Sequence, residues 1–345
     1  MNIAIRADGS KEIGLGHIVR CYALAEAFVE AGDEVTFFCS SKQHGGIDWL
    51  KQQKCNAISL HSNNIECEVN ELIAHLVVRN INVVVLDSYS LSSEYIRKLT
   101  GHKWIVVAVD DNCLYDYHCD IVVNGNLGAE DISYPVNQIG MVLQGGKYAM
   151  LRKEFAQIDP APLREQVKDI LVTMGGSDPN NCTPLVLRGL SHFGEVTIHV
   201  VVGGLMSNLY EIESAAKECK GKVLIHNQPE SMAQLMSECD LAISAGGGTA
   251  RELFAMGLFS LFIIQAENQL ALFGFFDNAK VPLCLGYYSD VYEEEIHKVV
   301  EGFIAAPSLR RQYREFMLSK VDRRGSYNVV KEIRICFQQL NRSYI

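Results

Sequence analysis

Short apolar runs alternate along the chain with longer segments in which apolar side chains recur at helical spacing. Residues 2–7 form a β-rich run, and residues 17–32 follow with helical periodicity that ends at Gly32. Similar apolar runs occupy residues 35–39, 83–86, 104–109, 121–123, 141–143, 170–174, 196–202, 223–225, 241–243 and 261–264. Continuous apolar runs of this length are typical of parallel strands that are buried on both faces. The pattern therefore predicts an α/β protein.

The alternation is interrupted once, by a segment with the composition of a linker, Asp159-Pro160-Ala161-Pro162. A chain of 345 residues is long enough for two domains of ordinary size. We therefore expect two doubly wound, Rossmann-like lobes that face a cleft, an N-terminal lobe of residues 1–155 and a C-terminal lobe of residues 156–345. From residue 293 on, the sequence is charged and helical in pattern.

Charge and composition exclude several classes of partner. The formal net charge of −10 argues against a nucleic-acid partner, which normally requires a basic face. The longest apolar run, residues 255–264, is too short to span a bilayer, so we expect no stable membrane insertion. The first residues enter a strand pattern without a basic segment, which predicts a cytoplasmic protein. The eleven cysteines are scattered without a C-x-x-C pair, so we expect reduced, mostly buried thiols and no metal site.

Glycine-rich turns follow three of the predicted strands. The first contains Gly14-Leu15-Gly16 before His17, the second covers residues 175–177, and the third covers residues 244–249. A glycine turn that opens a helix lets backbone N–H groups face an anion, although each turn could also be purely structural. The first is not a dinucleotide fingerprint, because Val19 stands where the third glycine would be required.

The third turn has side chains suited to a nucleotide. Thr249 can donate to a phosphate oxygen, and Glu252, three residues later, can accept from two ribose hydroxyls. The same spacing also fits a helix capping box, so both interpretations stay open. Residues 267–269 offer amide groups to hydroxyls. The sequence has no Asp-x-Asp pair, which favours binding of a diphosphate by backbone donors without a metal ion.

His17 lies at the carboxyl edge of the first predicted strand, where open α/β sheets bind ligands. A histidine there can abstract a proton from water or a hydroxyl, although it could also cap the turn. Residues 87–89 and 110–111 follow two other strands of the same lobe. Their aspartates are expected to line the cleft or to serve the core and turns.

Together these motifs resemble one enzyme family, the UDP-2,4-diacetamido-2,4,6-trideoxy-β-L-altropyranose hydrolases of pseudaminic acid biosynthesis. That family is similar in fold to the two-lobed GT-B glycosyltransferases, particularly the lipid-linked UDP-GlcNAc transferase of peptidoglycan synthesis. The resemblance extends in order over roughly residues 1–325, and residues 322–326 depart from it where the family is often richer in glycine. It rests on Arg6-x-Asp8, Gly14-x-Gly16-His17, Asp87-Ser88-Tyr89, Asp110-Asp111, residues 174–178, residues 245–252 and Glu267-Asn268-Gln269.

The resemblance implies a UDP-sugar substrate, water as the acceptor and no cofactor. His17 resembles the general base of the family, Tyr89 its cleft tyrosine, and Asn268 its sugar-contacting asparagine, and we expect His17 and Tyr89 to be catalytic. Water activated by His17 would attack the anomeric carbon, and UDP would leave with inversion. The expected substrate-binding residues are Asp8, Gly14, Gly16, Arg20, Asp87, Asp111, Gly175, Gly176, Ser177, Ser244, Ala245, Gly246, Gly247, Gly248, Thr249, Glu252, Asn268 and Gln269.

Two other functions use the same features. A glycosyltransferase would need an acceptor site, often an apolar patch on the N-terminal lobe. The apolar segment of residues 270–276 falls in the C-terminal lobe and is expected to be helix and core. A non-catalytic nucleotide-sugar binding protein would not need His17.

Overall fold

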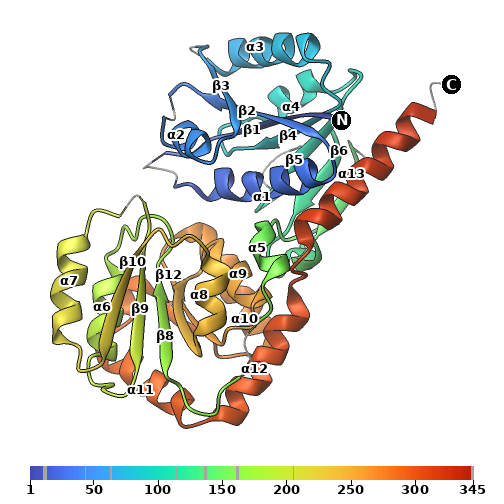
Figure 1. Ribbon diagram of the computed structural model, residues 1–345. Helices are drawn as coiled ribbons and strands as arrows, with labels where there is room; N and C mark the ends of the chain where they lie inside the picture. Colours follow the sequence, from blue (N-terminus) through green and yellow to red (C-terminus); the bar gives the residue numbers. More distant parts are fainter. Residues whose placement is uncertain are drawn as a thin grey trace. The chain divides into compact units, whose positions relative to one another are not determined.

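The computed structural model describes residues 1–10, 14–42, 44–62, 64–113, 116–135, 138–160, 163–204 and 206–342. The chain forms two compact units (Figure 1). Unit 1 contains residues 1–153 together with 324–345, and unit 2 contains residues 154–323.

Unit 1 is built on a seven-stranded parallel sheet with the order β3-β2-β1-β4-β5-β6-β7. The order reverses between β1 and β4, which makes the carboxyl ends of these two strands the switch point of the sheet. The strands are β1 (Asn2–Ala7), β2 (Glu34–Ser40), β3 (Asn56–Leu60), β4 (Val83–Asp87), β5 (Ile105–Val109), β6 (Cys119–Asn124) and β7 (Ile139–Gln144).

Helices cover both faces of this sheet because alternate strand residues point to opposite sides. Ile3 and Ile5 pack with the helices of one face, whereas Ala4 packs with those of the other. The first face carries α1 (Gly16–Glu30), α2 (His44–Gln52) and α13 (Gly325–Arg342), and the second carries α3 (Ile65–Val78) and α4 (Ser93–Leu99).

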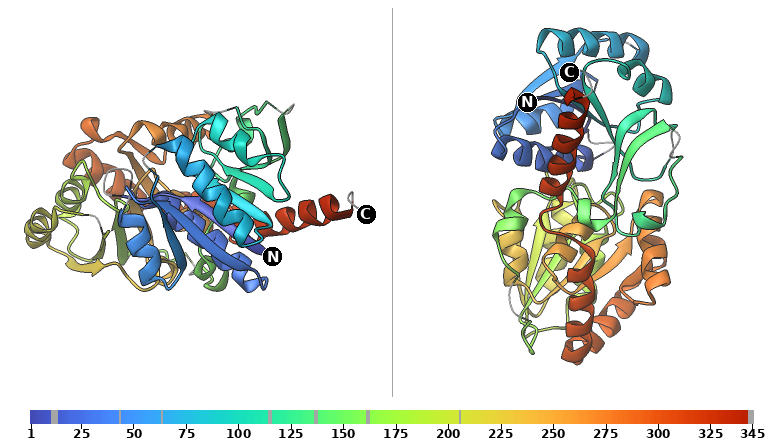
Figure 2. Two further views of the ribbon diagram at one scale, coloured as in Figure 1. Left: turned by 90° about the horizontal axis from the view of Figure 1, so that it is seen from above. Right: turned by 90° about the vertical axis from the view of Figure 1, so that its right-hand side faces the viewer.

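The last helix, α13, belongs to unit 1 and lies beside α1 (Figure 2). We expected residues 156–345 to form one lobe, and the structure corrects this for residues 324–345. The cause is the apolar face of α13, because Val329, Val330 and Ile333 are buried in the core of unit 1. The other boundary, between Lys153 and Glu154, lies two residues from the expected position.

Unit 2 has a six-stranded parallel sheet with the order β10-β9-β8-β11-β12-β13, which reverses between β8 and β11. Its strands are β8 (Asp169–Thr173), β9 (Thr197–Val202), β10 (Lys222–Asn227), β11 (Leu241–Ala245), β12 (Ser260–Ile264) and β13 (Cys284–Tyr287). Its helices are α6 (Cys182–Leu190), α7 (Leu209–Glu218), α8 (Met232–Glu238), α9 (Thr249–Ala255), α10 (Leu270–Ala279), α11 (Glu293–Ile304) and α12 (Pro307–Lys320), and α5 (Lys153–Gln157) begins at the boundary between the units.

The two parallel sheets confirm the predicted α/β class with two doubly wound units. Every predicted strand is present, and the structure adds the edge strands β3 and β13. Within the described ranges, no helix combines the length and apolar character needed to cross a bilayer.

Candidate functional site

His17 lies at the switch point of the unit 1 sheet, in the first turn of α1. The turn between β1 and α1 requires Gly14, because its φ of +76° is in the left-handed region that other residues rarely adopt. Gly16 begins α1, and a side chain there would meet nothing within 4 Å. His17 is 7% exposed, so the residue is largely buried but keeps a small accessible area.

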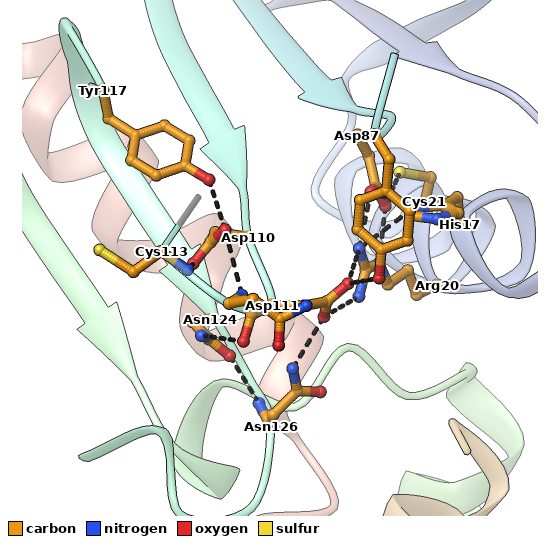
Figure 3. A network of polar contacts seen from close by, with 12 residues as sticks. His17, Arg20, Cys21, Asp87, Asp110, Asp111, Cys113, Tyr117, Asn124 and Asn126 are labelled. Atoms are coloured by element: carbon orange, nitrogen blue, oxygen red, sulfur yellow. Dashed lines mark hydrogen bonds and ion pairs between the residues drawn. The ribbon is translucent and has the colours of Figure 1, made fainter. Parts of the chain in front are cut away.

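His17 forms a dyad with Asp87, the last residue of β4. Nδ1 of His17 lies 2.6 Å from Oδ1 of Asp87 (Figure 3). Because an ionised carboxylate only accepts hydrogen bonds, this short contact assigns the imidazole proton to Nδ1. A nitrogen of Arg20 lies 3.2 Å from the same Nδ1, and this longer contact does not replace the hydrogen bond between His17 and Asp87. In the neutral form of the ring, the lone pair is then on Nε2, for which no hydrogen bond occurs among the described residues.

Asp87 is only 1% exposed, yet its surroundings keep it ionised. Arg20 donates to both oxygens at 2.7 Å, and the thiol of Cys21 donates to Oδ2 at 3.2 Å. Burial alone would raise the pKa of the Asp87 carboxyl, but Arg20 and His17 together lower the pKa well below its usual value. The dyad is therefore a buried carboxylate that orients an imidazole, the arrangement of a histidine general base.

A second carboxylate, that of Asp111, extends the network (Figure 3). Arg20 donates to its two oxygens at 2.6 and 3.0 Å, so one guanidinium bridges Asp87 and Asp111. Tyr89 donates to Asp111 at 2.5 Å, and its ring stands edge-on to His17 at 4.5 Å between centroids. Burial and the Asp111 charge raise the pKa of Tyr89, so this residue stays a phenol. One cation and two carboxylates give this network a net negative charge, which does not suit a diphosphate.

Asp8 has structural partners at the same edge of the sheet. Its Oδ1 forms an ion pair with Arg6 at 2.7 Å and accepts from the N–H of Ser40 at 2.9 Å. Its Oδ2 accepts from Ser88 at 3.2 Å. Asp8 thus ties together the carboxyl ends of β1, β2 and β4, and a direct substrate contact from it stays a prediction.

In unit 2, the turn of residues 175–177 follows β8, one of the two switch-point strands. Gly175 adopts φ +80°. The turn packs closely on the end of β9, because a Cβ added to Gly203 would lie 2.4 Å from the carbonyl oxygen of Gly176. No hydrogen bond within the described ranges uses the amide N–H of Gly175, Gly176 or Ser177. These donors are available to an anion.

The second turn of unit 2 follows β11, the other switch-point strand, whose last residue is Ala245. A Cβ on Gly246 would lie 2.9 Å from Ile264, so no larger residue fits there without displacement. The amides of Gly247 and Gly248 also lack hydrogen-bond partners in the described part of the chain. Ser244 is fully buried and donates to the carbonyl of Ala245, which favours a structural role for its hydroxyl.

Thr249 and Glu252 both lie in α9, which begins at Thr249 and is preceded by Gly248 as its N-cap. A capping box would require Thr249 at the N-cap position, which Gly248 occupies in the structure, and this disfavours the capping-box interpretation of Thr249 and Glu252. Glu252 is half-buried in the first turn.

Gln269 lies next to the same turn. Its Oε1 accepts from the N–H of Gln265 at 2.9 Å, and its Nε2 lies 3.7 Å from the Cβ position of Gly247. The backbone of Asn268 belongs to the 3₁₀ helix Glu267–Gln269, but its side chain lies outside the described residues.

Several members of the unit 1 network were not predicted from the sequence. Asn126 donates to Asp111 at 2.7 Å, and Asn124 donates to the carbonyl of Asp111 at 3.2 Å. Both lie at the carboxyl end of β6, so the rule that selected residues 87–89 would have found them too. Cys21 had no comparable signal, because a thiol at a buried helix position is ordinary.

Comparisons with known proteins identify sequences and solved structures that are similar to this chain. No protein-family profile matches the chain. The chain is 28% identical to an uncharacterized protein of Methanocaldococcus jannaschii over 86% of its length, and spans 63% of that protein. It is 25% identical to the spore coat polysaccharide biosynthesis protein SpsG of Bacillus subtilis, covering 98% of this chain and 99% of SpsG. It is 27% identical to the UDP-2,4-diacetamido-2,4,6-trideoxy-β-L-altropyranose hydrolase of Campylobacter jejuni, covering 78% and 93% of the two chains.

Solved structures agree on the fold. The chain resembles MurG of Acinetobacter baumannii with a TM-score of 0.67 at 15% identity, covering 96% of this chain and 99% of MurG. It resembles the UDP complex of UGT89C1 of Arabidopsis thaliana with a TM-score of 0.67 at 12% identity, covering 97% and 99% of the two chains. The chain is therefore related in sequence to the UDP-2,4-diacetamido-2,4,6-trideoxy-β-L-altropyranose hydrolase that its motifs indicated, and it has the GT-B fold of the glycosyltransferases.

Proposed function

We propose that this protein hydrolyses a UDP-linked 2,4-diacetamido-2,4,6-trideoxy hexose and releases UDP and the free sugar for pseudaminic acid synthesis. The observation that carries the proposal is the His17–Asp87 dyad at the switch point of unit 1, with Nε2 as the basic nitrogen. The sequence similarity to a hydrolase of this name supports the choice of substrate, and the UGT89C1 structure of the same fold contains UDP.

The proposed reaction is a single displacement at the anomeric carbon. Nε2 of His17 takes a proton from water while the water oxygen forms a bond to C1. The bond between C1 and the phosphate oxygen breaks, and its electron pair stays on UDP. A positioned base of this kind contributes about 10²–10⁴-fold to the rate. Attack from the side opposite to UDP inverts the configuration at C1.

The charge of the unit 1 network suits this step. The sugar becomes positively charged in a transition state of the oxocarbenium type. Arg20 neutralises one of the two carboxylates, Asp87 and Asp111, and the remaining negative charge favours that transition state. Tyr89 would confine the attacking water beside the imidazole, since its ring stands edge-on to His17.

Unit 2 would bind the nucleotide. The unpartnered amides of residues 175–177 and 247–248 would donate to the diphosphate and stabilise the charge that develops on the leaving group. Thr249 would donate to a phosphate oxygen, and Glu252 would accept from the ribose hydroxyls. Gln269, beside Gly247, and Asn268 would contact the sugar. We propose that this binding requires no metal ion.

The direct test is UDP release from synthetic UDP-sugars without any acceptor. We expect turnover with the 2,4-diacetamido-2,4,6-trideoxy sugar, and NMR of the fresh product should show inversion at C1. UDP-GlcNAc and UDP-GalNAc have hydroxyls at C4 and C6. A panel that includes them measures how much the acetamido group at C4 and the missing hydroxyl at C6 together contribute to turnover. Tight UDP binding without turnover of any member would contradict a hydrolase and favour a binding protein.

A UDP-sugar glycosyltransferase is the second candidate, because the solved structures of this fold include glycosyltransferases such as VinC in complex with dTDP, which has a TM-score of 0.63. The apolar segment of residues 270–276 lies in unit 2, whereas an acceptor patch is often on the N-terminal lobe, so this segment does not favour this candidate. In α10, Leu272 and Phe276 are buried as expected, but Leu270 and Phe273 are 49% and 48% exposed. Turnover that begins only after an acceptor is added would support this candidate over the hydrolase.

A further inference from the structure

A second buried carboxylate, that of Asp110, lies directly next to the proposed site without belonging to it. Asp110 follows β5 and is 5% exposed. The phenols of Tyr117 and Tyr134 each donate a short hydrogen bond to it, one to each oxygen. The backbone N–H groups of Cys113 and Asn112 donate to it at 2.7 and 3.3 Å. All four donors are neutral.

Both tyrosines remain donors over the working pH range. Burial raises the pKa of Tyr117 and of Tyr134, and the hydrogen bonds to Asp110 raise both values further. Each phenol therefore keeps its proton, and the carboxylate keeps its two side-chain partners. A buried polar network with all members satisfied specifies one geometry, because every shift leaves a group without a partner.

This network specifies the backbone geometry at Asp111. The backbone wraps around the Asp110 carboxylate, with Cys113 in the left-handed region at φ +54°. The carbonyl of Asp111 accepts from Asn124, whose amide also donates to the phenol oxygen of Tyr134 at 2.9 Å. The two peptide groups that follow Asp111 are thus held by the same cluster.

The Asp111 side chain then meets Arg20 at 2.6 and 3.0 Å and Tyr89 at 2.5 Å (Figure 3). We propose that Asp110, Tyr117 and Tyr134 form a positioning cluster that fixes Asp111 and, through Asp111, orients Arg20 and Tyr89 beside His17. The three residues do not touch His17, so they act by position. Arg20 is the link to the dyad, because the same guanidinium holds Asp87.

The test uses Tyr117→Phe, Tyr134→Phe and the double variant, each of which keeps the ring and removes a donor. Tyr327→Phe is the matched control, because it removes a phenol donor to another unit 1 carboxylate, that of Glu30 at 2.7 Å. The catalytic part of this test rests on the proposed hydrolysis, so one readout is independent of turnover. That readout is the solvent exchange of the Arg20 Nε–H proton in ¹⁵N NMR spectra, assigned by its absence in Arg20→Lys.

We expect the double variant to lower kcat about ten- to a hundredfold with KM changed less than about threefold, since small misplacements at a catalytic site cost this much. The Arg20 Nε–H should exchange about tenfold faster, because its surroundings open more often. The single variants should show smaller effects of both kinds, which keeps the test valid if the double variant folds poorly. If kcat and Arg20 exchange match those of Tyr327→Phe while only thermal stability falls, the cluster is structural and the proposal is overturned. If the parent protein releases no UDP, the exchange rate of the Arg20 Nε–H alone decides whether the cluster positions Arg20.

Discussion

Replacement of His17 by asparagine separates catalysis from folding at the proposed site. The Asn amide can occupy the position of Nδ1 and donate to Asp87, whose imidazole contact is 2.6 Å long. Asp87 also keeps its donors Arg20 and Cys21, so no buried carboxylate is left unpaired. What the variant loses is Nε2, the basic nitrogen. We therefore expect a loss of about 10²–10⁴-fold in kcat, the typical contribution of a positioned base.

The assay measures UDP release at saturating UDP-sugar together with calorimetric UDP binding. We expect UDP affinity to change less than about twofold, because the nucleotide contacts are proposed for unit 2, and loss of kcat with binding retained indicates a lost transition-state interaction. His61→Asn, an exposed histidine of the same unit, is the control. His17→Leu should be as inactive but less stable, since one donor to Asp87 is removed. A folded His17→Asn protein that releases UDP within about threefold of the parent rate would refute the assignment of the base, and Tyr89 would be tested next.

The remaining predictions concern the nucleotide, the metal requirement, pH and packing. Glu252→Ala should weaken UDP binding by roughly 1.5–3 kcal/mol, because hydrogen bonds to a charged group are lost; unchanged affinity by calorimetry would exclude Glu252 from the ribose site. Turnover should survive EDTA, and a loss of activity that Mg²⁺ or Mn²⁺ restores would contradict metal-independent diphosphate binding. The pKa of Asp87 is lowered in the folded state, so the ionised group stabilises the fold above its unfolded pKa of about 3.9, and this contribution is lost as the pH falls below that value. Urea unfolding should therefore show a steeper loss of stability between about pH 5 and about pH 2 in the parent than in Asp87→Asn, and equal slopes would contradict the ionised dyad. Gly203→Ala should cost about 1–3 kcal/mol of stability and weaken UDP binding, because its Cβ would lie 2.4 and 2.5 Å from the carbonyl oxygens of Gly176 and Gly175. Gly194→Ala, whose Cβ meets only Lys220 at 3.8 Å, is its control, and equal behaviour of the two would refute the close packing.

Most of the fold follows from local patterns. Strands buried on both faces need continuous apolar runs, and β1, β4 and β5 are recognisable for that reason. The edge strands β3 and β13 were missed because Ser59 and Gly286 interrupt their apolar residues, whereas the edge strands β7 and β10 contain continuous apolar runs. The assignment of α13 was wrong for another reason: its apolar stripe shows that the helix packs, but not on which unit.

The candidate site was also predicted only in part from the sequence. Ligands bind at the carboxyl ends of parallel strands, and this rule alone predicts that His17, Asp87, Tyr89 and Asp111 lie near one another. Their partners could not be predicted from that rule. Arg20 was expected to bind substrate, which stays a prediction, and the structure shows that it bridges two carboxylates.

Sequence by itself determined which residues stand at the functional edges of the two sheets, because strand periodicity and glycine turns are local properties of the chain. Tertiary structure decided how those residues are paired. Asp87 and His17 are 70 residues apart, and Asp111 and Arg20 are 91 residues apart. The ionisation of Asp87 and the tautomer of His17 depend on hydrogen bonds between such distant segments, and only the completed sheet brings those segments within bonding distance.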